Sequence, residues 1–181
     1  MSELNESKST EKAEQEERHQ VIQKIYEALL LGRVTLEALF GAKTVHADLI
    51  LSWVDPDYQK EHIGSPEEFQ IVLATVKPRQ TSNPHYHEVG TSTFAVLGEK
   101  IGITPPQNLL YRIGEVSISS KKAIISEVLQ CQEGMIIDIP PYTMHQFENQ
   151  SDIPAQLLIV THPIISVKKG EEDIHFVHIQ K

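Results

Sequence analysis

From Phe69 to the C-terminus, short apolar stretches rich in β-branched residues alternate with turn-forming residues. Residue pairs that contain proline, such as Asn83-Pro84 and Pro140-Pro141, separate several of these stretches. Short strands separated by such turns are typical of an all-β sandwich or barrel rather than a parallel α/β sheet. The candidate strands are FQIVLATV, TFAVLG, EVSIS, KAIISEV, GMIIDI, HQFEN, AQLLIVTH and HFVHI.

Nearer the N-terminus the hydrophobic period changes to that of a helix. Ile22, Ile25, Tyr26 and Leu29 recur at helical spacing, with charged residues between them. This pattern predicts an amphipathic helix. We expect it to pack on the outside of its own domain; the alternative is a helix that binds a partner or forms a dimer.

The remaining N-terminal sequence suggests how the chain is organised. A second short helical face over 36–40 and a capped turn at 65–68 precede the first candidate strand. Residues 1–18 are polar and charged, which predicts either a disordered acidic tail or an extension of the helix that follows. We therefore expect a tail over 1–18, a helical extension and lead-in segment over 19–64, and a barrel over 65–181.

Composition narrows the classes of partner. The 181 residues carry a formal net charge of −9, which argues against nucleic acid or an anionic membrane surface as a partner. Cys131 is the single cysteine, so no intramolecular disulfide can form and a reducing compartment is favoured. With no secretory leader and no apolar run of about 18 residues, we expect a cytoplasmic protein.

Three histidines carry the candidate chemistry. His85 and His87 stand two apart, so on a strand their side chains point to the same face, with roots roughly 6–7 Å apart. His145 follows the turn at Pro140-Pro141 and begins another candidate strand. Imidazoles arranged in this way can converge on one metal ion.

The spacing around these histidines resembles that of the cupin superfamily. The first cupin motif is Gly, five residues, His-x-His, three or four residues, Glu, six residues and Gly. The second is Gly, five residues, Pro-x-Gly, two residues, His, three residues and Asn. The positions that match are His85, His87 and Gly98 in the first motif, and Gly134, Pro140, His145 and Asn149 in the second. The resemblance implies a double-stranded β-helix, or jelly-roll, barrel carrying an N-terminal helical extension.

Three positions depart from the two motifs. Arg79 and Tyr142 stand where glycines are expected. The glutamate ligand is absent, and its place falls on Thr91 or Ser92, depending on how the segment before Gly98 is aligned. The resemblance therefore implies a metal site of three neutral imidazoles without a carboxylate.

Two nearby glutamates do not replace the missing ligand. Glu88 follows His87 directly, so on a regular strand it faces the opposite side. Glu148 lies three residues from His145 and also has the wrong parity. We predict that neither binds the metal, and that the remaining coordination positions are open to water, substrate or dioxygen.

The three-histidine set suggests which metals and reactions to consider. Imidazole suits Fe(II) as well as Zn, Ni, Co and Cu, whereas Mn prefers oxygen ligands. Three-histidine cupins similar to thiol and diketone-cleaving dioxygenases imply an Fe(II) enzyme acting on a small organic acid, thiol or diketone. The alternatives are a non-enzymatic cupin that binds a small molecule or serves a regulatory role, and a non-redox isomerase or lyase that uses its metal as a Lewis acid.

Two further residues are candidates for the site, and a homodimer is a candidate assembly. Tyr142 lies in the loop before His145 and could hydrogen-bond substrate or dioxygen; otherwise it packs at the barrel mouth. Arg79 shares the parity of His85 and His87 if the strand runs unbroken, and could then bind a substrate carboxylate. The alternative, which we favour, is an arginine at the rim or surface. Edge strands or the N-terminal helix could contribute to a homodimer.

Overall fold

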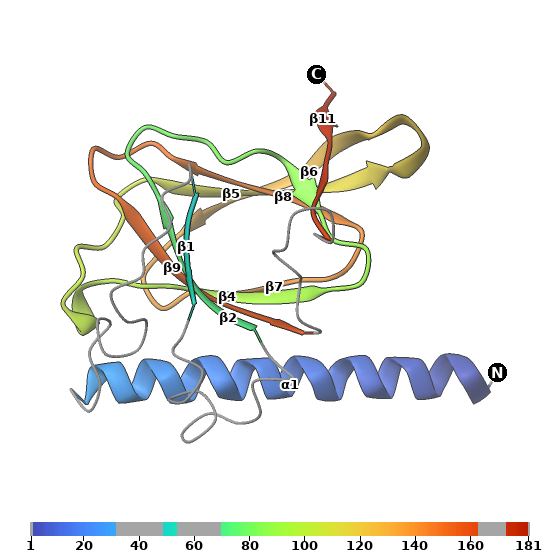
Figure 1. The fold of residues 1–181 in the computed structure, drawn as a ribbon, viewed down its shortest axis with the longest axis horizontal. Helices are drawn as coiled ribbons and strands as arrows, with labels where there is room; N and C mark the ends of the chain where they lie inside the picture. The colour runs from blue at the N-terminus through green and yellow to red at the C-terminus, as the bar shows by residue number, and fades with distance from the viewer. Residues whose placement is uncertain (1, 32–48, 54–69, 163–172, 181) are drawn as a thin grey trace.

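The computed structural model describes residues 2–31, 49–53, 70–162 and 173–180. One long helix, α1 (Ser2–Leu30), lies along the outside of a barrel made of two sheets (Figure 1). The helix begins at Ser2, so residues 2–18 extend the amphipathic helix, the second of the two interpretations of that segment. The helical face at 36–40 and the capped turn at 65–68 lie outside the described residues. None of the described helices has the length and apolar character needed to cross a membrane.

Most neighbouring strands of the two sheets are antiparallel. The first sheet has the order β1 (Leu49–Trp53), β2 (Gln70–Val76), β9 (Ala155–His162), β4 (Thr91–Val96), β7 (Ile136–Ile139). The second has the order β10 (His175–Phe176), β3 (His85–Tyr86), β8 (Thr143–Asn149), β5 (Leu109–Ser117), β6 (Lys122–Cys131), β11 (His178–Ile179). Single 3₁₀ turns, η1 (Glu99–Ile101) and η2 (Ile118–Ser120), follow β4 and β5. Only the short β11–β6 pair is parallel among the described strands.

All eight predicted strand segments overlap strands of the structure, which confirms the all-β jelly-roll prediction. The antiparallel two-sheet arrangement is that of a double-stranded β-helix with one N-terminal helix. The two-residue strand β3 was not predicted as a strand, because it is polar and follows a proline. The first half of β5 was also missed, because Leu109 to Gly114 lacks a continuous apolar run.

The barrel interior is filled by aromatic and aliphatic side chains from both sheets. Phe94, Tyr111 and Phe147 pack as a trio with ring centroids 4.8–5.0 Å apart, in edge-on and tilted arrangements. Their neighbours on β2 and β9 include Val76 and Leu157, both almost fully buried. These residues alternate along their strands with residues that face the other way.

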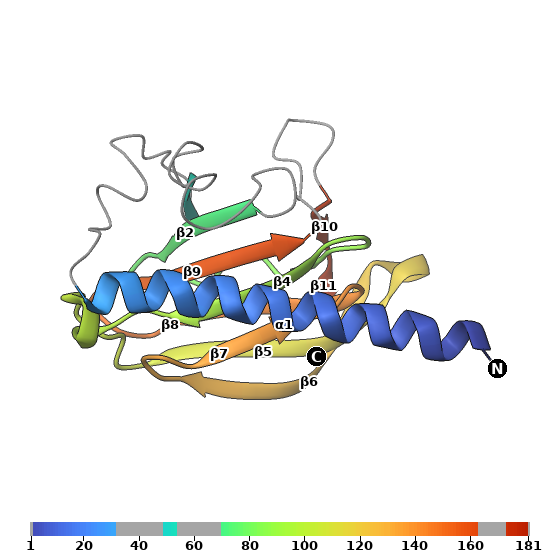
Figure 2. The same ribbon diagram turned by 90° about the horizontal axis from the view of Figure 1, so that it is seen from below.

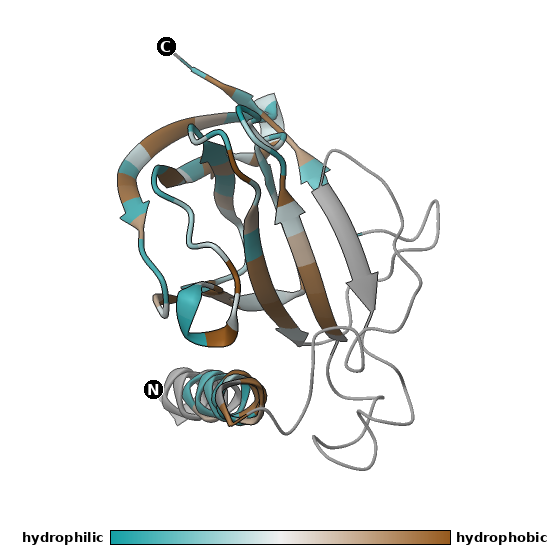
Figure 3. Cartoon of the chain, turned by 90° about the vertical axis from the view of Figure 1, so that its left-hand side faces the viewer, coloured by the Kyte–Doolittle hydropathy of each residue, from teal (hydrophilic) through white to brown (hydrophobic). Residues whose placement is uncertain are grey.

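The outer face of the first sheet is also apolar, and α1 covers it (Figures 2 and 3). Val21, Ile22, Ile25 and Leu29 of the helix pack on a second cluster formed by alternate strand residues. The strand residues of that cluster are Ile71, Ala95, Leu97, Leu158 and Val160. Burying an aliphatic side chain contributes about 1.5–3 kcal/mol, so this contact accounts for much of the helix's attachment. It confirms that the helix packs on the outside of its own domain.

Polar contacts fix α1 at one place along its length. Asp138 on β7 accepts hydrogen bonds from Gln15 Nε2 (2.8 Å), from the ring of His19 (2.7 Å) and from the Thr93 hydroxyl. Arg18, which is buried, donates to the same Thr93 hydroxyl at 3.1 Å. Burial alone would raise the pKa of Asp138, but the hydrogen bonds from Thr93, Gln15 and His19 outweigh it and lower the pKa.

The two motif positions that lack glycine still adopt the backbone conformation that favours glycine. Arg79 has φ 56° and Tyr142 has φ 58°, both in the left-handed region, and Gly134 has φ 77°. Non-glycine residues adopt such angles at a cost, because Cβ approaches the following carbonyl oxygen. The turn geometry of the two motifs is therefore present although two of their glycines are replaced.

Candidate metal centre

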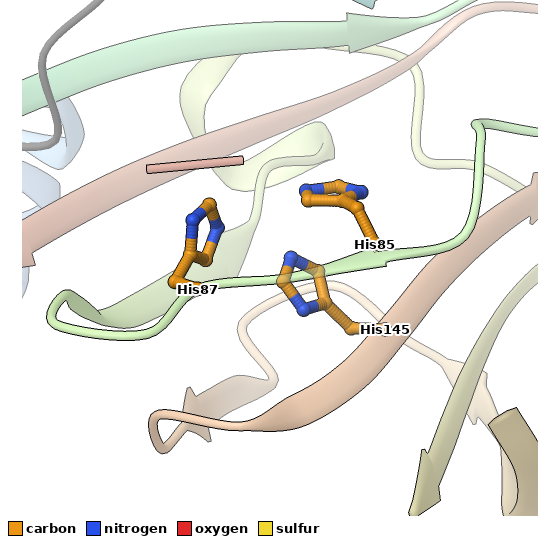
Figure 4. Close-up of side chains that lie close together, drawn as sticks. All are labelled: His85, His87 and His145. Carbon is orange, nitrogen blue, oxygen red and sulfur yellow. The ribbon is translucent and has the colours of Figure 1, made fainter. Parts of the chain in front are cut away.

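The three predicted histidines lie together, with their rings turned toward one another (Figure 4). His85 opens β3, His87 follows that strand, and His145 lies in β8 directly opposite His85 in the antiparallel register. The nitrogen atoms that could serve as ligands all lie within 4.8 Å of one another. Ring centroids are 4.1 Å apart for His85 and His145 and 5.1 Å for His87 and His145. This convergence fits a site for one metal ion.

Each imidazole is oriented by a backbone carbonyl. The Nδ1 atoms lie at hydrogen-bonding distance from the carbonyl oxygens of Asn83 (2.9 Å to His85) and Thr143 (3.2 Å to His145). The Nδ1 atom of His87 makes the same kind of bond to the carbonyl of Asp173. A carbonyl can only accept, so each Nδ1 carries the proton and each Nε2 lone pair is left for a metal.

Burial keeps the three rings neutral. Desolvation lowers the pKa of His85 to about 4, the bond to the Asn83 carbonyl opposes that shift, and the neighbouring His87 adds to it. Desolvation also lowers the pKa of His87, and it lowers that of His145 well below the usual value, with His85 and His87 adding to the effect. Neutral imidazole is the form that binds metal, so the site has its ligands deprotonated at neutral pH.

Among the described residues, no carboxylate or thiolate joins this group. Glu88 lies near the Tyr86 hydroxyl and His175 instead, and Glu148 pairs with Arg112. Both glutamates therefore lie outside the histidine group, as their parity predicts. Cys131 is buried in the barrel core, and burial raises the pKa of its thiol to about 12.

The strand β4 decides which residue occupies the inward position that the sequence alone left open. Phe94 and Val96 belong to the barrel core, and Ser92 has their parity. Thr91 has the parity of Thr93, whose hydroxyl contacts α1. Of the two candidates for the position of the missing glutamate, Ser92, which is 3% exposed, is therefore the one that faces the barrel interior.

Arg79 does not lie among the histidines. Its side chain is 63% exposed, and its Nε donates to the exposed Asp152 at 2.8 Å. Strand β2 ends at Val76 and β3 begins at His85, so Arg79 lies in a turn between them, with a left-handed backbone, and the parity argument for an inward side chain does not apply. The surface position, the alternative that we favour from sequence, is the one observed.

Tyr142 is joined to the site through its backbone. Its backbone N–H donates to the His87 carbonyl at 2.7 Å, and its half-exposed ring stacks on Tyr86 with centroids 6.2 Å apart. Tyr86 itself is buried and stacks on His175, on the side of β3 away from His85 and His87. The packing interpretation of Tyr142 accounts for these contacts, and a substrate contact by its hydroxyl stays a prediction.

The C-terminal segment contributes residues that the sequence gave no reason to connect with the site. Asp173 accepts the His87 bond through its carbonyl, and its carboxylate accepts the backbone N–H groups of Glu88, Val89 and Gly90. His175, for which no motif spacing exists, is 3.2 Å from the same carboxylate. Their only sequence signal is an Asp-x-His triplet just before the last candidate strand, which is too common to be specific.

Comparisons with known proteins bear on the fold. No family model matches the chain, and no curated protein matches it. The capsular polysaccharide assembling protein CapF from Staphylococcus aureus is similar in structure, with a TM-score of 0.53 and 15% identity over 75% of this chain. That match covers 31% of CapF, so this chain spans about a third of its length.

Two further solved structures resemble the chain less closely. The Cnp3 cupin domain from Schizosaccharomyces pombe matches with a TM-score of 0.46 and 6% identity, over 67% of this chain and 69% of that one. Oxalate decarboxylase matches with a TM-score of 0.48 and 15% identity, over 75% and 29%. The antiparallel two-sheet topology and the likeness to CapF agree on a jelly-roll barrel of the cupin type, and three histidines that could hold a metal lie together in it.

Proposed function

We propose that this protein binds one divalent transition metal through His85, His87 and His145, with Fe(II) as the favoured ion. With that metal it would act as a non-haem dioxygenase on a small thiol, diketone or organic acid. One observation supports the proposal most strongly. All three rings are neutral, hydrogen-bonded to backbone carbonyls at Nδ1, and gathered with their ligand atoms within 4.8 Å. A metal held there would supply coordination sites shared by substrate and dioxygen.

The neutral ligand set favours particular substrates. Without a carboxylate ligand, the site keeps the full double charge of a divalent ion, and an anionic ligand such as a thiolate or an enolised diketone would offset it. Such substrates ligate a metal directly and so require no protein cation. Arg79, the sequence candidate for binding a substrate carboxylate, is exposed and paired with Asp152, which supports thiols and diketones over organic acids that need an arginine for binding.

The chain's own residues have defined parts in this proposal. The carbonyls of Asn83, Asp173 and Thr143 hold the imidazoles in the ligating tautomer. Ser92 offers a small neutral side chain where other cupins have glutamate, which leaves room for substrate. Tyr142 is held next to His87 by its backbone N–H bond, and a contact between its hydroxyl and substrate or dioxygen would require its ring to turn away from Tyr86.

Metal analysis followed by oxygen uptake tests the proposal. The purified protein is assayed for bound metal, reconstituted anaerobically with Fe(II), and followed for O₂ consumption across a panel of thiols and diketones. We expect one metal per chain and substrate-dependent uptake that His85→Ala abolishes. Metal binding without uptake would instead support a Lewis-acid enzyme. No metal before or after reconstitution would refute the metal site and leave a non-enzymatic cupin.

A further inference from the structure

The segment 173–179 crosses the histidine-bearing end of the barrel. It is far from His85 and His87 in sequence, but β10 pairs antiparallel with β3, with His175 opposite Tyr86 and Phe176 opposite His85. The ring of Phe176 lies 6.2 Å from that of His85, between centroids. The C-terminal segment is therefore in contact with two of the three ligand positions.

Asp173 makes the densest set of contacts in this segment. One carboxylate oxygen accepts the Glu88 N–H (2.8 Å), and the other accepts those of Val89 (2.9 Å) and Gly90 (3.0 Å). Burial alone would raise the pKa of Asp173, but these three bonds outweigh it and lower the pKa, so the carboxylate is charged at neutral pH. The same residue's backbone carbonyl accepts the proton of His87 Nδ1.

We propose that Asp173 is a positioning residue for the metal centre: its carboxylate clamps the loop after His87, and this brings its own carbonyl against the His87 ring. The side chain and the backbone of one residue thus fix both the loop and the imidazole that precedes it. A carbonyl bonded to the second nitrogen of a ligating histidine sets the tautomer and the ring orientation. This inference rests on the proposed metal site.

Contacts further along the segment hold the clamp in place. Val177 is buried with Tyr86, Ala123 and Met144, and its N–H donates to the Pro84 carbonyl at 3.1 Å. The N–H of His178 then donates to the backbone carbonyl of Lys121 at 2.9 Å, which joins the segment to the β6 edge of the second sheet. Metal binding and docking of this segment are consequently linked, so metal should protect the segment and the docked segment should strengthen metal binding.

Three readouts on Asp173→Ala test the proposal: Co(II) affinity, the Co(II) spectrum and hydrogen exchange. Asp152→Ala is a matched control because Asp152 is an exposed aspartate outside the histidine group. Co(II) is the probe for affinity and for its visible absorption spectrum. We expect Asp173→Ala to weaken Co(II) binding about 10–100-fold and to change the spectrum. Hydrogen exchange of the metal-free protein should be at least about tenfold faster at Glu88, Val89 and Gly90. Asp152→Ala should leave all three readouts unchanged.

The outcomes separate this inference from the proposed function. Wild-type affinity, spectrum and exchange in Asp173→Ala would overturn the positioning role while leaving the metal site intact. If the wild type binds no Co(II), the proposed function fails, and the exchange measurement alone decides whether Asp173 clamps the loop. Asp173→Asn keeps the size and one acceptor oxygen, so it should fold even if the alanine variant does not. It should fall between wild type and Asp173→Ala, and wild-type values for it would also overturn the proposal.

Discussion

The outer face of the first sheet and the histidine-bearing end of the barrel differ in what holds them together: apolar packing in the first, and hydrogen bonds of polar groups in the second. The outer face is a run of regular strands whose apolar residues meet an apolar stripe on α1. The histidine end contains the two-residue strands β3 and β10, a left-handed residue at 142, and polar side chains hydrogen-bonded to the backbone. The first arrangement supplies stability, and the second keeps three desolvated imidazoles neutral, which costs stability unless a metal is bound.

The largest expected effect comes from removing a ligand at the histidine end. His145→Ala should abolish stoichiometric metal binding. Removing a group that only hydrogen-bonds to a ligand typically weakens metal affinity about 10–100-fold, so removing a ligand itself should weaken it by more than about 100-fold. Isothermal titration with Co(II) measures this. His178→Ala, which removes an exposed histidine of β11, is the control and should bind metal normally. Retention of stoichiometric metal by His145→Ala would refute the ligand assignment.

The matching test on the outer face is Ile22→Ala. Ile22 of α1 is fully buried against the sheet, so the variant should lower the free energy of unfolding by about 2–5 kcal/mol. Metal affinity of the folded protein should not change. Denaturant unfolding measures the first quantity, with the exposed Lys24→Ala on the same helix as control. A loss below about 1 kcal/mol would mean that the helix contributes little to the fold.

The pH dependence of stability isolates the cost of neutral histidines. In the metal-free protein the pKa of His85 is about 4, against about 6.5 in an unfolded chain. As pH falls from about 6.5 toward 4, the unfolded chain gains a proton that the folded chain does not, so stability falls by at most about 3 kcal/mol from His85. Denaturant midpoints across this range measure the change. His85→Asn should make the profile less steep, because His87 and His145 still contribute to it, and an unchanged profile would contradict the pKa assignment.

A smaller effect is expected where polar contacts anchor the helix. Asp138→Asn replaces a charged acceptor of hydrogen bonds from Gln15, His19 and Thr93, and should cost about 1–3 kcal/mol. Because these groups lie on the α1 side of the sheet, metal affinity should stay as in the wild type. Thermal unfolding and Co(II) titration of the same sample check both statements. A weakened metal site would show that the two regions are coupled.

The smallest effect is expected at Arg79. Its ion pair with Asp152 is exposed at both partners, and such pairs contribute little. Arg79→Ala should therefore change Co(II) affinity and substrate KM by less than about twofold. A large rise in KM for a carboxylate substrate, with unchanged Co(II) affinity, would instead place Arg79 in substrate binding.

How well the sequence predicts a feature of this molecule depends on how far apart in the chain the interacting residues are. The strands of the barrel follow from a period-two pattern that is local to each strand, and α1 follows from a helical period. The pairing of β10 with β3 and the clamp at Asp173 join segments more than 80 residues apart, at positions without distinctive residue types. Arg79 shows a different limit: the parity argument assumed one unbroken strand, but β2 ends at Val76 and Arg79 lies in the turn before β3.

The sequence by itself determined the barrel, the helix and the three histidines. Alternation of apolar and polar residues, the helical period and the motif spacing can all be read directly from the residue order. It also determined that the glutamate ligand is absent. Only the tertiary structure decided that Ser92 rather than Thr91 faces inward, since that choice depends on which face of β4 meets the core and which meets α1. It likewise decided that Asp173 orients His87, because that contact exists only once two segments 86 residues apart in the chain are packed together.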